Sequence, residues 1–187
     1  MRVDRVCGSL QQVPPNRELP GIRVAIDSDC ESLADMRLRL QQLLEQESPA
    51  LWRMTEARRA ALPEFYAQCI HDRDVRVLVA EVQEEGTQHI VATAVGRIEV
   101  GRDVARFGSI EDVWVEPAYR GQGYAYESAV ACRDYGADVL GLERIVAFTT
   151  LDNEASGKLL VRLGFKYEGT IPWGKEGDLS TVYAYTP

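Results

Sequence analysis

The stretch WVEPAYRGQGYAYESA, from Trp114 to Ala129, constrains the fold most, because strand-like residues there change abruptly into helix-like ones. β-Branched and apolar residues predict a strand at 105–117, and small apolar residues at helical spacing predict a helix from about 123 to 140. The segment RIVAFTT at 144–150 predicts the next strand. A strand, a helix and a second strand in this order indicate a parallel βαβ crossover.

The residues before this crossover predict helices first and antiparallel strands after them. A short strand at 22–26 leads into a helix at 27–47, and Pro49 separates that helix from a second one at 55–70. Further strands are expected at 75–82, 89–100, 165–171 and 180–186, turns at Glu84–Gly86 and Gly101–Asp103, and a short helix at 153–164. This order predicts a mixed α/β (α+β) sheet, with antiparallel strands followed by the parallel crossover.

Two of the helices show an apolar face that we expect to pack on the sheet. In the 27–47 helix this face holds Leu33, Met36, Leu40, Leu43 and Leu44. In the 123–140 helix it holds Ala125, Ala129, Cys132, Gly136 and Val139. Because the second set consists mostly of small residues, that helix is expected to lie close to the sheet.

The length and the hydrophobic content predict one domain with a full-sized core. The chain has 187 residues, 45% of them hydrophobic. We assign this domain to residues 21–187. Residues 1–20 contain Pro14, Pro15 and Pro20 and little periodicity, so they are interpreted as a flexible or edge-lying extension.

The charge and the cysteines exclude several classes of protein. Lys and Arg number 21 against 29 Asp and Glu, a net charge of -8, which argues against a general nucleic-acid binder. The cysteines Cys7, Cys30, Cys69 and Cys132 form no CxxC pair, so neither a zinc site nor a disulfide framework is expected. The histidines His71 and His89 each stand alone, which also argues against a metal site. Without a membrane-span-sized apolar run or a signal-peptide core, a soluble cytoplasmic protein is expected.

The glycine-rich turn predicts an anion site at the start of the 123–140 helix. Arg120, Gly121 and Gly123 crowd into four residues there. Glycines let the backbone approach a ligand closely, and the first N–H groups of a helix attract phosphate. Neither a Walker A loop nor a G-x-G-x-x-G fingerprint is present, so the alternative is a plain strand-to-helix turn.

The wider context resembles the GCN5-related N-acetyltransferase (GNAT) superfamily, in particular its ribosomal-protein N-acetyltransferase-like branch. The segment V-x-V-x-P-x-Y-R-G-Q-G-Y-A is followed by LDNEASGKLLVRLGF, and the resemblance covers residues 107 to 170. The family's R/Q-x-x-G-x-G/A loop is matched by Arg120, Gly123 and Ala125. Its asparagine opening the next helix is matched by Asn153, and the LGF that ends this helix begins at Leu163.

This resemblance implies a GNAT-like fold that binds acetyl-CoA as co-substrate. The pyrophosphate would bind the loop formed by Arg120, Gly121, Gln122, Gly123, Tyr124, Ala125 and Tyr126. The pantetheine arm would follow the backbone of Val113, Trp114 and Val115, in a gap where two parallel strands splay apart, and Asn153 would cap its helix and contact pantetheine. The two tyrosines of the loop have an alternative interpretation as ordinary amphipathic surface residues.

Glu111 and Asp112 are the candidates for the base that an amine acceptor requires. An alkylamine has a pKa near ~10.4, so about one molecule in a few thousand is neutral at pH 7. Strict alternation predicts Glu111 on the face of Val113 and Val115, and Asp112 on the face of Ile110 and Trp114; a bulge would exchange these faces. Polyamine-acetylating relatives carry an E-D pair here with the glutamate as base, so Glu111 is preferred; the alternative is a structural carboxylate.

The acid that protonates the departing thiolate is harder to assign. Many family members have a tyrosine seven residues after the asparagine, and Leu160 occupies that position here. Ser156, in the first turn of the same helix, is the substitute we favour, and relatives that acetylate ribosomal N-termini also carry a serine there. Its alternatives are a helix-start serine that satisfies backbone N–H groups, a displaced tyrosine, or water.

Three functions therefore stay open. The first is an N-acetyltransferase that moves the acetyl group of acetyl-CoA to a primary amine of a small molecule by direct attack through a tetrahedral intermediate. The second uses a peptide amine, at a protein N-terminus or a lysine. The third is a non-catalytic acyl-CoA-binding sensor. Relatives build the acceptor pocket near residues 43–52, where Glu45 and Glu47 would attract a cationic amine; the alternative, which the pattern favours, is a loop with ordinary solvated acids. A homodimer is an open alternative to the monomer.

Overall fold

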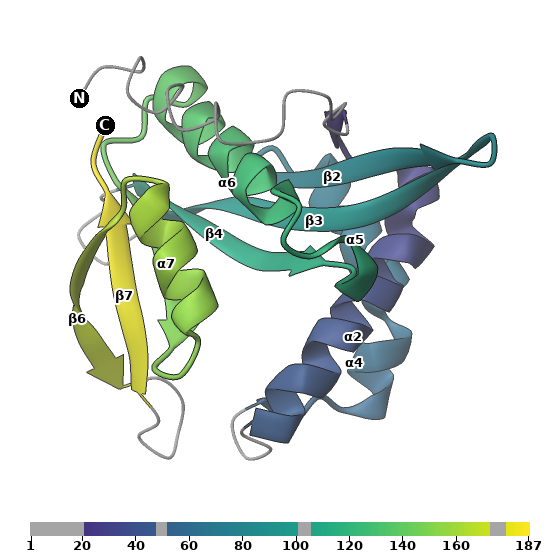
Figure 1. The fold of residues 1–187 in the computed structure, drawn as a ribbon, viewed down its shortest axis with the longest axis horizontal. Helices are drawn as coiled ribbons and strands as arrows, with labels where there is room; N and C mark the ends of the chain where they lie inside the picture. Colours follow the sequence, from purple (N-terminus) through teal and green to yellow (C-terminus); the bar gives the residue numbers. More distant parts are fainter. Residues whose placement is uncertain (1–20, 48–51, 101–105, 173–178) are drawn as a thin grey trace.

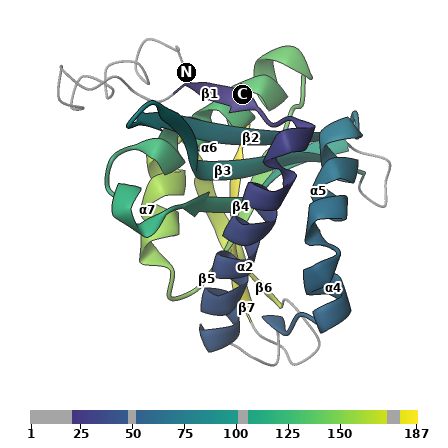
Figure 2. The same ribbon diagram turned by 90° about the vertical axis from the view of Figure 1, so that its right-hand side faces the viewer.

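The computed structural model describes residues 21–47, 52–100, 106–172 and 179–187, which form one seven-stranded sheet with helices on both faces (Figure 1, Figure 2). The strands are β1 (Ile22–Val24), β2 (Val75–Glu84), β3 (Thr87–Val100), β4 (Arg106–Val115), β5 (Ile145–Thr150), β6 (Lys166–Pro172) and β7 (Leu179–Tyr185). The helices are α2 (Cys30–Glu47), α4 (Glu56–Ala60), α5 (Leu62–His71), α6 (Tyr124–Asp134) and α7 (Glu154–Arg162). The predicted extension at 1–20, Pro49 and the predicted turn at 101–103 lie outside the described residues.

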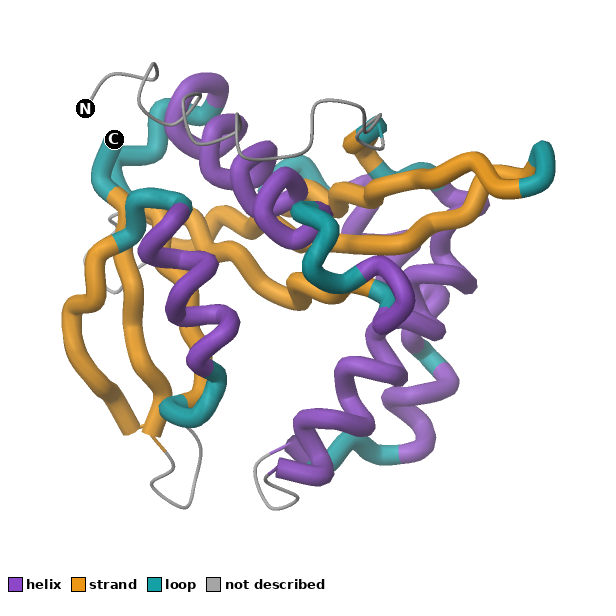
Figure 3. Tube along the Cα trace, viewed as in Figure 1, coloured by secondary structure: helices purple, strands orange, loops and turns teal. Residues whose placement is uncertain are grey.

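The sheet is mixed, as the sequence predicted. Its strand order is β1-β2-β3-β4-β5-β7-β6. All neighbouring pairs are antiparallel except β4 and β5, which run parallel and are joined through α6. The β2–β3 hairpin turns at Glu85 and Gly86, both with positive φ, where a turn was expected. Figure 3 shows β2, β3 and β4 diverging from β5, β6 and β7.

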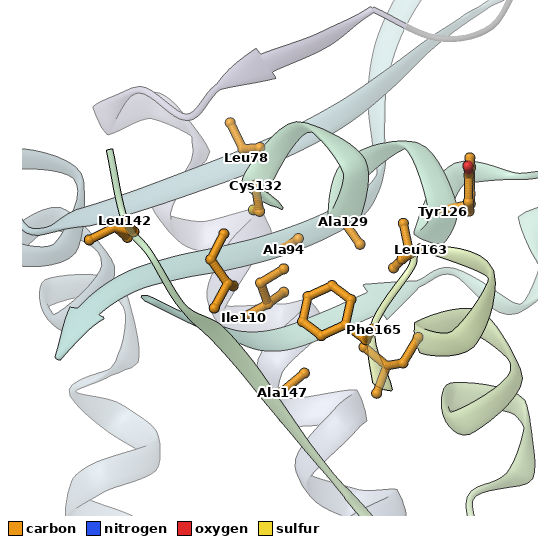
Figure 4. Packing of buried hydrophobic residues seen from close by; sticks show 12 residues of the cluster. Leu78, Ala94, Ile110, Tyr126, Ala129, Cys132, Leu142, Ala147, Leu163 and Phe165 are labelled. Carbon is orange, nitrogen blue, oxygen red and sulfur yellow. The ribbon is translucent and has the colours of Figure 1, made fainter. Parts of the chain in front are cut away.

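Two apolar layers hold the helices to the sheet. On one face, α6 and α7 contribute Tyr126, Ala129, Leu160 and Leu163 to a cluster with strand residues such as Ile110 (Figure 4). On the other face, α2 and α5 pack Leu33, Tyr66 and Cys69 against β2 and β3. Burial of apolar side chains on both sides is the main contribution to the stability of such a sheet.

Small residues let α6 lie close to the sheet, as its sequence predicted. A Cβ atom on Gly136 would come within 2.9 Å of Ile145, and one on Gly108 would come within 2.9 Å of Leu142. One on Gly96 would lie 3.7 Å from the Cys132 sulfur. Gly96 of β3 therefore leaves room for α6, Gly136 lets the turn after α6 approach β5, and Gly108 of β4 leaves room for Leu142 in the loop that follows.

The helix predictions need three corrections. The predicted 55–70 helix is divided into α4 and α5 at Ala61, because Pro63 in the first turn of α5 has no N–H to continue the hydrogen-bond ladder. After α6 the chain makes a wider π turn at Tyr135–Val139, which changes the helical phase, so Val139 is exposed rather than on the packed face. Leu43 is also exposed, because the end of α2 extends away from the sheet (Figure 1).

Within the described residues, no helix is long and apolar enough to cross a membrane. Cys30, Cys69 and Cys132 are buried free thiols. His71 and His89 are exposed, and His71 lies 2.9 Å from the Asp27 carboxylate. Among the residues that can be described, His, Cys, Asp and Glu do not gather into a metal-binding group.

Candidate active site

The sheet opens between β4 and β5, which creates the gap that the family resemblance predicted. The two strands pair only from Gly108 with Ile145 to Ile110 with Ala147. Beyond Ile110, the described part of β4 has no partner on β5, so the backbone N–H and C=O groups along this edge can bond to a ligand. The gap lies between α7 and the start of α6 (Figure 1).

A β-bulge interrupts β4 at the point where the gap begins. The register with β3 shifts between the pairs Thr93–Trp114 and Val95–Glu111, and Asp112 has a φ of 46°. A positive φ is uncommon outside glycine and is best tolerated by Asp and Asn. The bulge therefore adds one residue to β4 and changes which side chains face each layer.

The bulge brings both acidic side chains to the α2 and α5 side of the sheet. Asp112 pairs with Arg37 of α2, whereas Ile110 packs in the cluster beneath α6. Glu111 pairs with Arg97, whose other contact is Cys69 of α5. The prediction from strict alternation, which put Glu111 on the face of Val113 and Val115, is wrong because a strand with a bulge does not alternate.

Glu111 is the more accessible of the two carboxylates. Its side chain is 41% exposed. The Ser109 hydroxyl donates to Glu111 Oε1 at 2.9 Å, and Arg97 Nε lies 3.7 Å from Glu111 Oε2. These two contacts fix the carboxylate in orientation while a large part of it faces solvent.

Asp112 is more enclosed than Glu111, and its contact comes from Arg37 of α2. Its side chain is 27% exposed, and Arg37 Nε lies 3.4 Å from Asp112 Oδ1. Burial raises the pKa of the Asp112 carboxyl; the positive charge of Arg37 opposes this rise, and the nearby Glu111 adds to it. Two adjacent carboxylates thus sit in different electrostatic surroundings, a common arrangement where one group has to accept a proton.

The loop before α6 has the backbone geometry of an anion site. Gly121 and Gly123 have φ values of 74° and 99°, which other L-residues rarely adopt. Gly123 is the N-cap of α6 and offers no side-chain acceptor to the first helical N–H groups. A Cβ on Gly121 would meet no atom within 4 Å, so the surface of the loop is open there.

Arg120 is folded back towards the strand rather than extended. Its Nε donates to the Val115 carbonyl at 3.1 Å, and its guanidinium lies 4.7 Å from the centre of the Trp114 ring. Gln122 similarly donates to the Ala118 carbonyl at 3.1 Å. The side chains of these loop residues brace the turn, and the backbone of the loop is what faces outward.

Tyr124 and Tyr126 are buried, so the interpretation of them as surface residues is wrong. Tyr124 packs edge-on against Tyr119, and the Tyr126 ring carries the Arg162 guanidinium 4.3 Å from its centre. The Tyr126 hydroxyl is buried without a hydrogen-bond partner among the described residues. Since a buried hydroxyl normally has a partner, Tyr126 fits a site that binds a polar ligand.

The start of α7 confirms the predicted cap. The Asn153 side chain accepts a hydrogen bond from the Ser156 N–H at 3.0 Å. Leu160, at the position where many relatives have a tyrosine, is buried in the core cluster. Tyr183 of β7 was not predicted as a neighbour of this helix start; its hydroxyl would be 2.9 Å from a Cβ on Gly157, next to Ser156.

Glu45 is fully engaged in contacts within the protein. It accepts from the Met54 N–H at 2.9 Å and from Gln41 Nε2 at 2.8 Å, and it pairs with Arg59 at 2.6 Å. These contacts, with the Met54 hydrogen bond first, lower the pKa of Glu45 to about 2. Its charge is therefore compensated, which weakens the prediction that Glu45 attracts a cation; the side chain of Glu47 is not described.

A parallel pair of strands that opens beside a glycine-rich helix start defines the architecture of the GNAT acetyltransferases. The chain belongs to this family: residues 23–166 match the family described as "Acetyltransferase (GNAT) domain".

Relatives and solved structures agree with this assignment. The chain is 31% identical over 102 residues to the uncharacterized N-acetyltransferase YoaA of Bacillus subtilis, and 37% identical over 68 residues to YnaD of the same organism. These matches span 54% and 34% of this chain, and 49% and 40% of the two relatives.

Among solved structures, a ribosomal-protein-alanine N-acetyltransferase from Brucella melitensis is similar with a TM-score of 0.69 and 20% identity, over 89% of this chain and 99% of that one. A spermidine N-acetyltransferase from Vibrio cholerae, in complex with CoA and spermine, has a TM-score of 0.68 and 17% identity, over 89% and 94%. At these identities the similarity concerns the fold.

Proposed function

We propose that this protein is an acetyl-CoA-dependent N-acetyltransferase that acts on a primary amine of a small molecule. One observation carries the proposal: the bulge at Asp112 sets two carboxylates beside the free edge of β4, where the strands diverge. A base next to an open backbone edge is the arrangement that acyl transfer to an amine requires, since the amine must lose a proton as it attacks.

The donor side of the site fits acetyl-CoA. The open backbone of the loop at Gly121–Gly123 and the start of α6 would bind its pyrophosphate, and the unpaired edge of Val113–Val115 would bind its pantetheine arm. Acetyl-CoA supplies an acetyl group activated as a thioester. Backbone N–H groups on the β4 edge are suited to stabilise negative charge on the acetyl oxygen.

The acceptor side would use Glu111 as the base, directly or through water. Glu111 is the accessible carboxylate, and it keeps a fixed orientation through Ser109 and Arg97. Asp112 would lie beside the amine and hold it, and it would take over as base if the amine binds closer to Asp112 than to Glu111. The Ser156 hydroxyl, in the first turn of α7, would return a proton to the leaving thiolate.

The charges near the bulge favour an acceptor with one amine over a polyamine. Glu111, Asp112 and Glu116 are each paired with an arginine, and the arginines are Arg97, Arg37 and Arg39 respectively. Because these three pairs are neutral, little uncompensated negative charge is left to attract several cationic centres. The same compensation of charge also supports a second candidate function, in which the acceptor is the single N-terminal amine of a peptide.

The test uses two variants that keep shape and remove basicity. Glu111→Gln should lower kcat by about 100-fold or more near neutral pH, the usual contribution of a positioned base. The loss should shrink as pH rises, because more of the amine is already neutral. Asp112→Asn is the companion, and thiol release with a panel of amines is the measurement.

Two results would contradict parts of this proposal. If both variants keep the wild-type kcat at every pH, the base is not on β4. If the wild-type protein binds CoA but releases no thiol with any amine, the sensor function replaces the enzymatic one.

A further inference from the structure

Gln41 is a polar residue in an unusual place. It lies on α2, and its side chain is among the largest that are fully buried, with 1% of the residue exposed. A buried amide is retained only where its hydrogen bonds are made, because an unpaired one costs about 1–3 kcal/mol. The contacts of Gln41 therefore indicate its role.

Each end of the Gln41 amide has a partner. Arg37 Nη1 donates to Gln41 Oε1 at 2.9 Å. Gln41 Nε2 donates to Glu45 Oε1 at 2.8 Å and also to the carbonyl of Trp52. The residue thus joins a cation on one side to a carboxylate and a loop carbonyl on the other.

These partners extend the chain of contacts in both directions. Towards the sheet, Arg37 Nε lies 3.4 Å from Asp112 Oδ1 at the bulge. Away from the sheet, Glu45 accepts from the Met54 N–H at 2.9 Å, which fixes the segment Trp52–Met54 that follows α2. Gln41 is the central link between this segment and the bulge.

We propose that Gln41 is a positioning residue: it holds the Arg37 guanidinium against Asp112 and so ties the orientation and charge of that carboxylate to the segment Trp52–Met54. The inference rests on the proposed function, in which Asp112 lies beside the reacting amine.

The physical reason is the geometry of the guanidinium. Arg37 reaches Asp112 with Nε and Gln41 with Nη1, so the two contacts fix one rotamer of a side chain that is otherwise flexible. Without Gln41 the guanidinium loses one of its two fixed partners and is free to move away from Asp112. The carboxylate then loses the positive charge that opposes its burial.

Several other groups act on Asp112, and all of them stay in place when Gln41 is changed. They are Glu111 and Arg97 on the neighbouring strand positions, and Tyr66 and Cys69 on α5. A change in the titration of Asp112 after substitution of Gln41 therefore reports on Arg37.

The direct test is the titration of Asp112 by carboxyl ¹³C NMR, with its resonance assigned by loss in Asp112→Asn. Gln41→Met keeps the length of the side chain and removes both of its hydrogen-bonding ends. The midpoint of Asp112 should rise by about 1 pH unit, the lower end of the effect of a close opposite charge. Gln42→Met, at the exposed neighbouring position on α2, is the matched control and should leave the midpoint unchanged.

A double-mutant comparison separates this role from simple support of the fold. In an Arg37→Met background, Gln41→Met should cause no further rise, because the group through which it acts is gone. If Gln41→Met lowers the Tm and leaves the Asp112 midpoint at its wild-type value, the inference is wrong. Should Gln41→Met fail to fold, Gln41→Leu is the second variant, because it also removes both hydrogen-bonding ends of the side chain and leaves Arg37 and Asp112 unchanged.

Kinetics complete the test. In Gln41→Met, the acid limb of the pH profile of kcat should move to higher pH. The decrease in kcat relative to the wild type should therefore be larger at pH 6 than at pH 8. The KM for acetyl-CoA should change less than about twofold. If no amine is acetylated, the proposed function fails, and the NMR titration still decides whether Gln41 acts on Asp112. If acetylation proceeds and Asp112→Asn has the wild-type pH profile, the functional half of this inference is overturned.

Discussion

The two sides of the candidate site are built in different ways. On the donor side, the loop Arg120–Tyr126 obtains its geometry from its own backbone, through two glycines with positive φ. On the acceptor side, the carboxylates of β4 depend on arginines from α2 and β3. A site made by backbone torsion angles is specified by consecutive residues, whereas a site made by side-chain pairs exists only once distant elements have packed.

The largest effect is expected on CoA binding when the donor side, whose geometry is set by its backbone, is changed. Gly123→Val places a β-branched residue at a φ of 99° and should weaken CoA binding by about 100-fold, since each hydrogen bond to a charged group contributes about 1.5–3 kcal/mol. The measurement is the thermal stabilisation produced by CoA.

Gly86→Val is the control for this change. Gly86 has a φ of 82° in the β2–β3 turn, so the same substitution causes similar backbone strain far from the loop. It should lower the Tm and keep the CoA-induced shift. A full shift in Gly123→Val would show that CoA binds elsewhere.

A smaller effect is expected on the side determined by side-chain pairs. The pKa of Asp112 is raised above its ordinary value of 3.8, so the folded protein holds this proton to higher pH than the unfolded chain does. Protonation of Asp112 contributes fully to the free energy of unfolding when the pH is below the pKa of this group in the unfolded chain. The contribution is lost as the pH rises through the pKa of the group in the folded protein. The free energy of unfolding of the wild type, relative to Asp112→Asn, should therefore fall as the pH rises above about 4, by about 1.4 kcal/mol for each unit of pKa difference between the folded and unfolded states.

Urea unfolding of both proteins across this range is the measurement. Asparagine suits the comparison because it tolerates the positive φ at this position. A constant difference between the two proteins at all pH values would mean that the surroundings of Asp112 do not change its titration on folding.

The smallest effect concerns the contact between Gly157 and Tyr183. Alanine in a helix interior is favoured over glycine by about 1 kcal/mol, but a Cβ here would lie 2.9 Å from the Tyr183 hydroxyl oxygen. Gly157→Ala should therefore give no gain in stability, and adding Tyr183→Phe should recover most of the gain. Equal stabilisation by Gly157→Ala with and without the tyrosine hydroxyl would contradict the contact.

The sequence predicted most of the fold and the donor side of the candidate site, whereas much of the acceptor side was not predicted. Helices, strands and the glycine turn follow from local patterns, and the prediction of Asn153 as a cap is confirmed because a cap involves residues close in the chain. The bulge at Asp112 was not predictable, since its register depends on the pairing with β3. Arg37 was also missed, because on α2 it has the pattern of a solvated helix face and its partner is distant in the sequence.

The burial of Leu160 has a consequence for how this protein can be altered. Many relatives have a tyrosine at this position, so replacing the leucine by tyrosine is an obvious way to add a proton donor to the proposed site. Leu160 is enclosed by the core cluster beneath α6 and α7, and a phenol ring there would overfill the space at a cost of about 1–3 kcal/mol. Introducing tyrosine at this position therefore needs compensating changes in the core first, so the leucine limits how the proton donor of this site can be engineered.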